Sequence, residues 1–440
     1  MTDTLPSLRT AIEKRSVTVG VIGLGYVGLP AACVIAEAGF KVTGIDIDAK
    51  RVEMINSGHS PIEGDEPGLA SLLTRVIDSK HLHASTAHKD LARADIVLIC
   101  VDTPVEADHK PRFAALKSAC ESLGAVLKKG ALVIIESTIA PGTIDTIVRP
   151  ALESATGGVA GERFHLGHCP ERVMPGKLLR NMRTMNRVCG GSSPEVADAM
   201  RALYSTYVEG DLDPTDCLTA ELVKTAENAY RDVSIAFANQ LAVICEVVGG
   251  DVWRVRDLVN KVPGRYVLLP GGGVGGHCIP KDSWLLATPL GAAAEESLLG
   301  VARRVNDGMP GHVADLVGEL SDPKSHAKIA VLGYSYLENS DDTRNSPSAA
   351  LKRSLEQRGY EVSVHDPFVH EYAGDVMEAL RGADCAVVMV AHSAYRELDL
   401  QAAAATMRRA QMVDARALFK AETLKVAGFT VRTIGVGTAS

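Results

Sequence analysis

This chain has few aromatic residues and no net positive charge, and each of these absences excludes a class of partner. Only 4% of the 440 residues are aromatic, so a stacking platform for single-stranded nucleic acid is not expected. The formal net charge is −8, which argues against a nucleic-acid or membrane surface as partner. Long apolar runs are missing too, since segments such as 96–101 and 131–135 have the length of a strand and not of a membrane span.

The cysteines lack the paired spacing of a disulfide framework. All nine are scattered along the chain, which favours reduced thiols. Residues 1–16 are polar and contain no apolar core of a signal peptide. We therefore expect a cytoplasmic protein. Because 440 residues exceed what one hydrophobic core organises, we also expect two to four domains.

A glycine-rich turn joins a strand to a helix near the start of the chain. The sequence predicts a strand at 17–22, a helix at 29–38 and a second strand at 41–45 that ends at an acid, Asp46. This order is typical of a dinucleotide-binding βαβ unit. Further strands at 96–101 and 132–136, separated by helical stretches, predict a parallel, doubly wound sheet.

Each residue of the turn has a role in such a unit. Gly23 permits the tight turn, Gly25 lets the backbone approach a pyrophosphate, and Gly28 lets helix and strand pack closely. Asp46 would accept hydrogen bonds from a ribose 2′-OH and repel a 2′-phosphate, so NAD is favoured over NADP. A purely structural glycine turn is the alternative.

A second copy of the pattern occurs late in the chain. Strand, helix and strand are predicted at 328–333, 347–358 and 359–366, the last ending in Asp366. This copy lacks the full glycine fingerprint, so we expect a different ligand there. Residues 215–248, without proline or interior glycine, predict one long helix between the copies. The predicted fold is α/β, with two Rossmann-like doubly wound parallel-sheet domains joined by a long-helix central domain, and a homodimer through that helix.

One thiol stands on a glycine-rich backbone in the segment 270–282. Cys278 follows five glycines, and Lys281 and Asp282 come shortly after it. A thiol is a nucleophile only as thiolate, which a nearby cation or backbone N–H groups favour. A buried, inert cysteine in a tight turn is the other interpretation.

The long helix carries polar residues at helical spacing. Lys224 and Asn228 are four apart and hence on one face, with Arg231 on the same stripe. A lysine beside an amide donor suits a developing alkoxide or oxyanion, although a solvent-facing pair is the simpler interpretation. Glu171 and Arg172 follow a predicted strand end, where ligands of such sheets bind.

A nicotinamide site together with a thiol indicates oxidation at the aldehyde level. The thiolate adds to an aldehyde, the adduct gives up a hydride, and water releases an acid from the thioester. If the same site also forms the aldehyde from an alcohol, two NAD are used per substrate. Asp282 would orient a base or water. The neighbouring His165, His168 and Cys169 could suggest a metal, but no second cluster has ligand spacing, and we expect none.

The chain resembles the UDP-glucose/GDP-mannose dehydrogenase family from about Val17 to its C-terminal domain. The motifs are Gly23–Gly28, Thr103-Pro104, Glu136-Ser-Thr138, Cys169-Pro-Glu-Arg172, Lys224 with Asn228, Gly-Gly-His-Cys278 and Asp341–Pro347. The resemblance implies a four-electron 6-dehydrogenase of a nucleotide sugar, made of an NAD domain (1–210), a helical dimerisation domain (211–310) and a UDP-sugar domain (311–440). It places the product in surface polysaccharide synthesis.

The loop at Cys169–Val173 and the helix residues up to Asn239 are similar to the branch that acts on UDP-2-acetamido sugars. UDP-N-acetyl-D-mannosamine is the expected substrate, with UDP-N-acetylglucosamine and UDP-glucose as alternatives. The glucose branch has a second glutamate where this chain has Pro175.

The resemblance also assigns residues to ligands. Cys278, Lys224, Asn228, Asp282 and Glu171 would be catalytic. The residues expected at NAD are Gly23, Gly25, Tyr26, Val27, Gly28, Asp46, Thr103 and Thr138. Those expected at the UDP-sugar are Arg172, Val173, Lys224, Asn228, Arg231, Arg265, Gly275, Tyr336, Arg344 and Arg416.

The chain departs from the family pattern at three places. Gly264 stands where the family has arginine, with Arg265 one residue later, Leu337 replaces a lysine, and Arg416 replaces another. The first two remove positive groups that would face a diphosphate or sugar.

Two other functions stay open at this point. A two-electron hydroxyacid or sugar-acid dehydrogenase would share the first domain, the long helix and the Lys224–Asn228 pair but would not need Cys278. A catalytically silent NAD-binding protein is the second.

Overall fold

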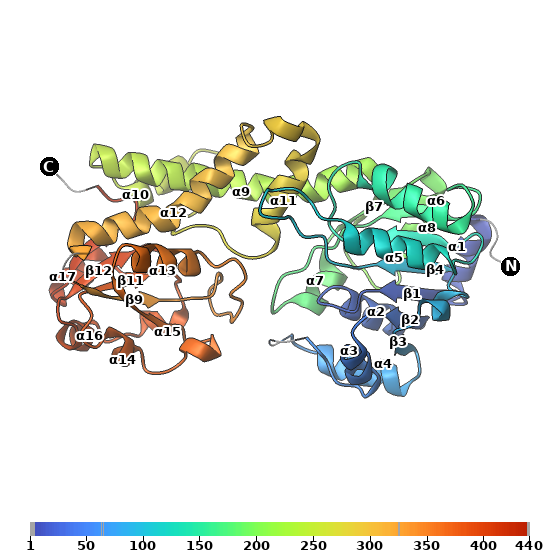
Figure 1. Ribbon diagram of the computed structural model, residues 1–440, viewed down its shortest axis with the longest axis horizontal. Helices are drawn as coiled ribbons and strands as arrows, with labels where there is room; N and C mark the ends of the chain where they lie inside the picture. Colours follow the sequence, from blue (N-terminus) through green and yellow to red (C-terminus); the bar gives the residue numbers. More distant parts are fainter. Residues whose placement is uncertain (1–4, 63, 65, 324–325, 438–440) are drawn as a thin grey trace. The chain divides into compact units, whose positions relative to one another are not determined.

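The computed structural model describes residues 5–62, 64, 66–323 and 326–437, and the chain divides into two compact units (Figure 1). The first unit is Met1–Glu227 and the second is Asn228–Ser440. Each unit contains one sheet with helices on both of its faces, as the predicted α/β fold requires. Within the described ranges, no helix is both long and apolar enough to cross a membrane.

The sheet of the first unit has eight strands in the order β3-β2-β1-β4-β5-β6-β7-β8. Neighbouring strands are parallel except β6 and β7, which are antiparallel, a reversal that the sequence did not reveal. The strands are β1 (Thr18–Ile22), β2 (Lys41–Ile45), β3 (Leu82–Ser85), β4 (Ile96–Ile99), β5 (Leu132–Ile135), β6 (His165–His168), β7 (Arg187–Gly191) and β8 (Leu212–Asp216).

Both faces of this sheet are buried. In β4, Ile96 and Leu98 belong to one hydrophobic core, whereas Val97 and Ile99 belong to the core on the opposite face. Because every residue of β4 faces a core, the strand reads as a continuous apolar run, as parallel strands do. The covering helices are α1 (Leu5–Glu13), α2 (Gly28–Glu37), α3 (Ala49–Asn56), α4 (Leu69–Asp78), α5 (Ala114–Gly124), α6 (Arg149–Thr156), α7 (Leu178–Thr184) and α8 (Pro194–Tyr204).

The predicted long helix is present as α9, Cys217–Val248, with 32 residues. At its start the Asp216 carboxylate accepts a hydrogen bond from the Thr219 N–H at 2.8 Å, as an N-cap does. At its end Gly249 adopts a positive φ of 75°, a conformation that glycine provides and that stops the helix.

The second unit holds a parallel sheet in the order β10-β9-β11-β12-β13. The strand–helix–strand pattern predicted at 328–366 is confirmed as β9, α13 and β10. Ile329 and Val331 of β9 face one core, and Ala330 and Leu332 face the other. The strands are β9 (Lys328–Leu332), β10 (Glu361–His365), β11 (Cys385–Val388), β12 (Gln411–Asp414) and β13 (Thr430–Thr433).

The helices of the second unit fall into two groups. Three precede the sheet, namely α10 (Val252–Val259), α11 (Cys278–Ala287) and α12 (Leu298–Leu320). The others connect its strands, namely α13 (Pro347–Gln357), α14 (Val376–Leu380), α15 (Ser393–Arg396), α16 (Leu400–Thr406) and α17 (Ala421–Val426).

Candidate active site

The glycine turn after β1 has the shape that a dinucleotide needs. A Cβ on Gly23 (φ 87°) would lie 2.6 Å from the Cys100 carbonyl oxygen, and one on Gly28 would lie 1.8 Å from the Gly23 oxygen. Both positions therefore exclude side chains for packing reasons. A Cβ on Gly25 would meet nothing within 4 Å. The missing side chain of Gly25 leaves open space beside the start of α2, where a pyrophosphate fits.

Asp46 connects the second strand to this turn. Its carboxylate accepts hydrogen bonds from the Leu24 N–H at 2.8 Å and the Asp48 N–H at 3.0 Å. Arg51 of α3 forms an ion pair with it at 3.1 Å. The carboxylate is only 6% exposed, yet it retains capacity for a further donor because two oxygens together have about four acceptor sites.

Other residues expected at the cofactor also lie close to one another. The buried Thr103 hydroxyl donates to the Thr138 carbonyl at 2.6 Å, so these two predicted residues meet at adjacent strand ends. Tyr26, within the glycine turn beside Val27, donates a hydrogen bond from its hydroxyl group to the Glu66 carboxylate.

The loop after β6 is held by carboxylates. Glu171 is buried and accepts the Val173 N–H at 2.8 Å. Arg172 forms an ion pair with Glu227 and also donates to the Asn186 carbonyl. Its guanidinium is thus fixed before any substrate is bound.

Lys224 is buried, at 6% exposure, and not on a solvent-facing surface. Burial, with a smaller contribution from the charge of Lys224, lowers the pKa of nearby His168 to about 4 despite a hydrogen bond to the Ile135 carbonyl. One turn earlier on α9, Glu221 accepts the N–H groups of Gly142 and Ile144 at 2.6 and 2.8 Å. Burial raises the pKa of Glu221 to about 7, against these two hydrogen bonds.

In the second unit, Cys278 is the first residue of α11, and it is exposed. This overturns the interpretation of a buried, inert thiol. Four residues later Asp282 is 1% exposed and accepts a hydrogen bond from the Asn228 side-chain amide at 2.6 Å. The Lys281 ammonium is 3.7 Å from the other oxygen of Asp282. Asn228 thus meets Asp282 on the helix that begins with Cys278, and all three are residues that the sequence predicts to be catalytic.

Residues of the loop before α13 pack against the glycines that precede the thiol. The Gly276 N–H donates to the Arg344 carbonyl at 2.9 Å, and a Cβ on Gly275 would lie 2.6 Å from Tyr336. Burial raises the pKa of Tyr336, and a negative charge on Cys278 would add to the rise. The Arg344 guanidinium forms a two-pronged pair with Asp342, which raises its pKa.

The other three of the five arginines expected at the UDP-sugar differ in their surroundings. Arg416 is half-buried, pairs with Glu338 at 3.3 Å and lies beside Gly271. Arg231 and Arg265 are exposed. The departure at Leu337 places an apolar side chain, 42% exposed, next to Glu338.

Sequence reasoning missed the carboxylates that hold these groups. Glu66 accepts the N–H groups of Gly176 and Leu178 at 2.9 and 3.2 Å in addition to the Tyr26 hydroxyl. It thereby joins the glycine turn to the loop after β6. Its position in Glu66-Pro-Gly, just before α4, was a usable signal. Glu227 and Glu338 gave no signal, because their arginine partners are distant in sequence.

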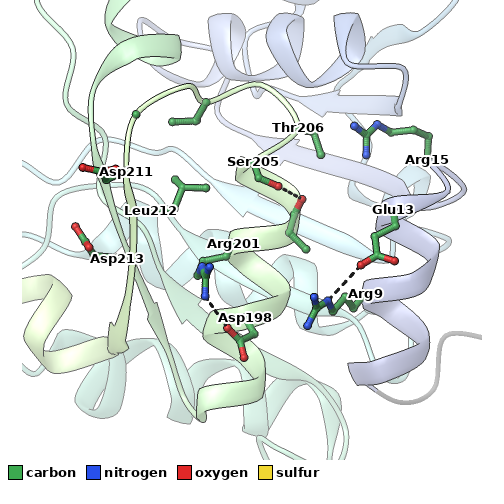
Figure 2. A pocket seen from close by; sticks show the side chains of 13 residues that line it. Arg9, Glu13, Arg15, Asp198, Arg201, Ser205, Thr206, Asp211, Leu212 and Asp213 are labelled. Carbon is green, nitrogen blue, oxygen red and sulfur yellow. Dashed lines mark hydrogen bonds and ion pairs between the residues drawn. The ribbon is translucent and has the colours of Figure 1, made fainter.

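A hollow of about 760 Å³ lies elsewhere in the first unit, between α1, α8 and β8 (Figure 2). Its wall is charged, and part of this charge is paired within the wall, as in Arg9–Glu13 at 3.3 Å and Arg201–Asp198 at 3.2 Å. None of the residues predicted from the sequence lines it.

The histidines near β6 do not assemble a metal site. Across the described residues, no group of three or more metal-ligating side chains comes together. His168 is fully buried with its Nδ1 at 2.8 Å from the Ile135 carbonyl, and Cys169 is buried as well.

Three models of one family match consecutive parts of the chain. They are the NAD binding domain, the central domain and the UDP binding domain of the UDP-glucose/GDP-mannose dehydrogenase family, at residues 17–208, 218–308 and 330–421. The chain belongs to the UDP-glucose/GDP-mannose dehydrogenase family. It is an NAD-dependent nucleotide-sugar dehydrogenase.

Relatives within the UDP-glucose/GDP-mannose dehydrogenase family match nearly the full length. UDP-N-acetyl-D-mannosamine dehydrogenase of Pyrococcus horikoshii is 37% identical over 95% of this chain and 99% of its own. An NDP-N-acetyl-D-galactosaminuronic acid dehydrogenase of Ralstonia nicotianae is 35% identical over 94% and 98%. The solved structure of the Pyrococcus horikoshii enzyme has a TM-score of 0.89, covering 96% of this chain and 99% of that one at 36% identity.

Proposed function

We propose that this dehydrogenase oxidises the C6 hydroxymethyl group of a UDP-2-acetamido sugar to a carboxylate, in four electrons, through a covalent adduct on Cys278. The observation that carries the proposal is the exposed Cys278 thiol at the start of α11, the helix on which the buried Asp282 accepts a hydrogen bond from the half-buried Asn228. A two-electron hydroxyacid dehydrogenase has no use for such a thiol.

The first oxidation removes a hydride from C6 and a proton from its hydroxyl group. Lys224 takes the hydroxyl proton and the Asn228 amide donates to the oxygen as negative charge develops on it. Bound NAD supplies the hydride acceptor here and in the second oxidation. Lys224 is buried on α9, one turn before Asn228, so the two side chains lie on the same face of the helix.

The second oxidation proceeds on the sulfur. The Cys278 thiolate adds to the aldehyde carbon and forms a C–S bond, loss of hydride converts this thiohemiacetal to a thioester, and water breaks the C–S bond. Asp282 orients that water. The balance is one alcohol, two NAD⁺ and one water giving one carboxylate, two NADH and three protons.

UDP-N-acetyl-D-mannosamine is the substrate that we propose, and the relatives named for mannosamine and galactosaminuronic acid chemistry support a 2-acetamido sugar. The test is a panel of UDP-activated N-acetylmannosamine, N-acetylglucosamine, N-acetylgalactosamine and glucose with purified protein, scoring NADH per uronic acid. Two NADH per acid, highest for N-acetylmannosamine, is expected. One NADH per product would indicate a two-electron dehydrogenase. NAD binding without turnover of any sugar would indicate a catalytically silent NAD-binding protein.

We further propose that two copies pair through α9. Tyr230, Phe237 and Ile244 recur every seven residues on this helix and are 74%, 58% and 49% exposed. Large exposed apolar side chains in one stripe are typical of a surface covered in an assembly. Sedimentation should show a dimer, and Phe237→Glu should weaken it. A monomer at micromolar concentration would contradict this pairing.

The three-part division at 1–210, 211–310 and 311–440, and a role of the uronic acid in surface polysaccharide, belong to the same proposal. The lengths and order of the three family matches support the division.

A further inference from the structure

A chain of buried polar side chains runs through the helices of the second unit, and none of them enters the reaction described above. They lie on α9, α11 and α12 and are at most 1% exposed. They are Asp232, Asn239, Ser283, Arg303 and Asn306.

Asn239 lies at one end of this chain. Its side-chain oxygen accepts the backbone N–H of Gly271 at 2.9 Å, and its side-chain amide donates to Asn306 at 2.9 Å. Asn306 in turn donates to the Asp232 carboxylate at 2.7 Å. Hydrogen bonds through the side chains of Asn239 and Asn306 thus link the backbone N–H of Gly271 to the Asp232 carboxylate.

Asp232 lies at the other end. One carboxylate oxygen accepts from the Arg303 guanidinium at 2.7 Å, and the other accepts from the Ser283 hydroxyl at 2.8 Å. A buried ion pair adds little net stability over apolar residues of similar size, because both charges lose their hydration. Its benefit here is therefore positional: it fixes α11 against α9 and α12.

The two anchored points, Gly271 and Ser283, enclose Cys278. The thiol lies seven residues after one and five residues before the other. The glycine-rich backbone between Gly271 and Cys278 has little stiffness of its own. Apart from the hydrogen bond of the Gly276 N–H to the Arg344 carbonyl, the orientation of the thiol therefore depends on what holds the ends of this segment.

We propose that Asn239 and Asp232 are positioning residues for the Cys278 thiol. The proposal rests on the proposed role of Cys278 as the nucleophile. Both side chains are fully buried, so they act through the segment that they hold and not on the substrate. They hold the segment 271–283 so that the sulfur meets the aldehyde carbon in a reactive geometry, where displacement by about 1 Å costs on the order of 10²-fold in rate.

Two variants of the full-length protein test this. Asn239→Ala removes the anchor at Gly271. Ser283→Ala removes the hydrogen bond between α11 and Asp232. In that variant Asp232 stays paired with Arg303, and Asn228 still bonds Asp282 of α11. We expect kcat to fall about 10²-fold in the first and about tenfold in the second, with the NAD dissociation constant unchanged.

Alkylation of Cys278 by iodoacetamide, followed by mass spectrometry across pH, gives a readout that does not depend on turnover. In both variants we expect the midpoint of alkylation to move to higher pH, because the thiol no longer keeps its place at the N-terminus of α11. Cys278→Ser shows which adduct belongs to this residue.

Gln411→Ala is the matched control. Gln411 is a half-buried carboxamide of the same unit that also donates one hydrogen bond, to Leu320 at 2.8 Å, and accepts one, from Ser321 at 2.6 Å. The Gln411→Ala substitution should lower the midpoint of thermal unfolding and leave kcat and the alkylation of Cys278 unchanged.

Asn239→Ala and Ser283→Ala variants that keep kcat and the alkylation profile within twofold of the parent, with only a lower thermal midpoint, would overturn the positioning role. If instead Cys278→Ser still produced acid, the proposed function would fail, whatever the alkylation showed.

Discussion

In both sheets an aspartate follows the second of two consecutive strands, but the surroundings of the two carboxylates differ. Asp46 follows β2, and Asp366 follows β10. In each unit a glycine follows the first of these two strands, and the aspartate accepts the backbone N–H of the residue after that glycine. The donor is Leu24 at 2.8 Å for Asp46 and Tyr334 at 2.6 Å for Asp366. The shared contact indicates that the acid first of all shapes the turn.

The remaining partners separate the two acids. Asp46 pairs with Arg51, whose side chain is 37% exposed, so the carboxylate borders on open surface. Asp366 is fully buried, and the ring of His392 occupies its outer side at 3.0 Å. His392 in turn accepts the Asn339 N–H at 2.9 Å. We therefore predict a ribose contact for Asp46 and none for Asp366, which has no exposed surface.

The largest effect should come from Cys278→Ser, in the second unit. Acid formation should become undetectable because a serine hydroxyl is not a nucleophile at neutral pH without a base. NAD affinity, measured by calorimetry, should stay at the parental value since the glycine turn belongs to the first unit. Continued acid production would contradict covalent catalysis.

Lys224→Ala should come next. We expect kcat to fall by about 10²–10⁴-fold if Lys224 moves the proton of the C6 hydroxyl. Lys224→Arg serves as the comparison, because it keeps the charge but cannot act as a base. An effect below threefold in both would remove Lys224 from the mechanism.

Asp366→Asn should reduce stability and leave cofactor choice alone. Burial alone would raise the pKa of Asp366, but hydrogen bonds from His392 and from the N–H groups of Ser335, Tyr334 and Phe368 outweigh it and hold the pKa below its ordinary value. An amide cannot accept all of these donors, so we expect a loss of about 2–4 kcal/mol in denaturant unfolding of the second unit.

The same group predicts a pH dependence. With the pKa of Asp366 depressed in the folded state, its contribution is complete above the unfolded value of about 4 and is lost as pH falls through the folded value. Acid unfolding of the parent should therefore begin below about pH 4 and be less steep in Asp366→Asn. An equal slope in both would show that other carboxylates dominate.

The smallest effect should come from Asp46→Asn. The ratio of NAD to NADP efficiency should fall about tenfold, because the repulsion of a 2′-phosphate is removed and Arg51 is released to meet it. Asp46→Asn combined with Arg51→Ala is the control, and it should accept NADP poorly. No change in preference in the single variant would mean that another residue recognises the ribose.

Much of this architecture was predictable from the sequence, because it rests on local patterns. The spacing Gly23–Gly25–Gly28 and the acid at 46 are consequences of steric limits within one turn. The helix at 217–248 follows from an uninterrupted helical composition. The reversal between β6 and β7 had no such signal, since both strands are short and glycine-rich.

The site was predictable only in part. Residue type and spacing pointed to Cys278, Lys224 and Asp282, because a thiol, an amine and a carboxylate can be recognised from the sequence alone. The partners Glu66, Glu227 and Glu338 come from distant segments, and pairing at a distance leaves no trace in a single sequence. The burial of Lys224, which decides its chemistry, likewise appears only in the fold.

Helix α9 places Asn228, Asp232 and Asn239 within roughly 40° of one line along its surface, since each residue turns the helix by about 100°. Inserting or deleting a single residue between them would rotate the downstream amide to another side and uncouple it from Gly271. The spacing of eleven residues between Asn228 and Asn239 is therefore fixed, whereas surface loops elsewhere tolerate extra residues.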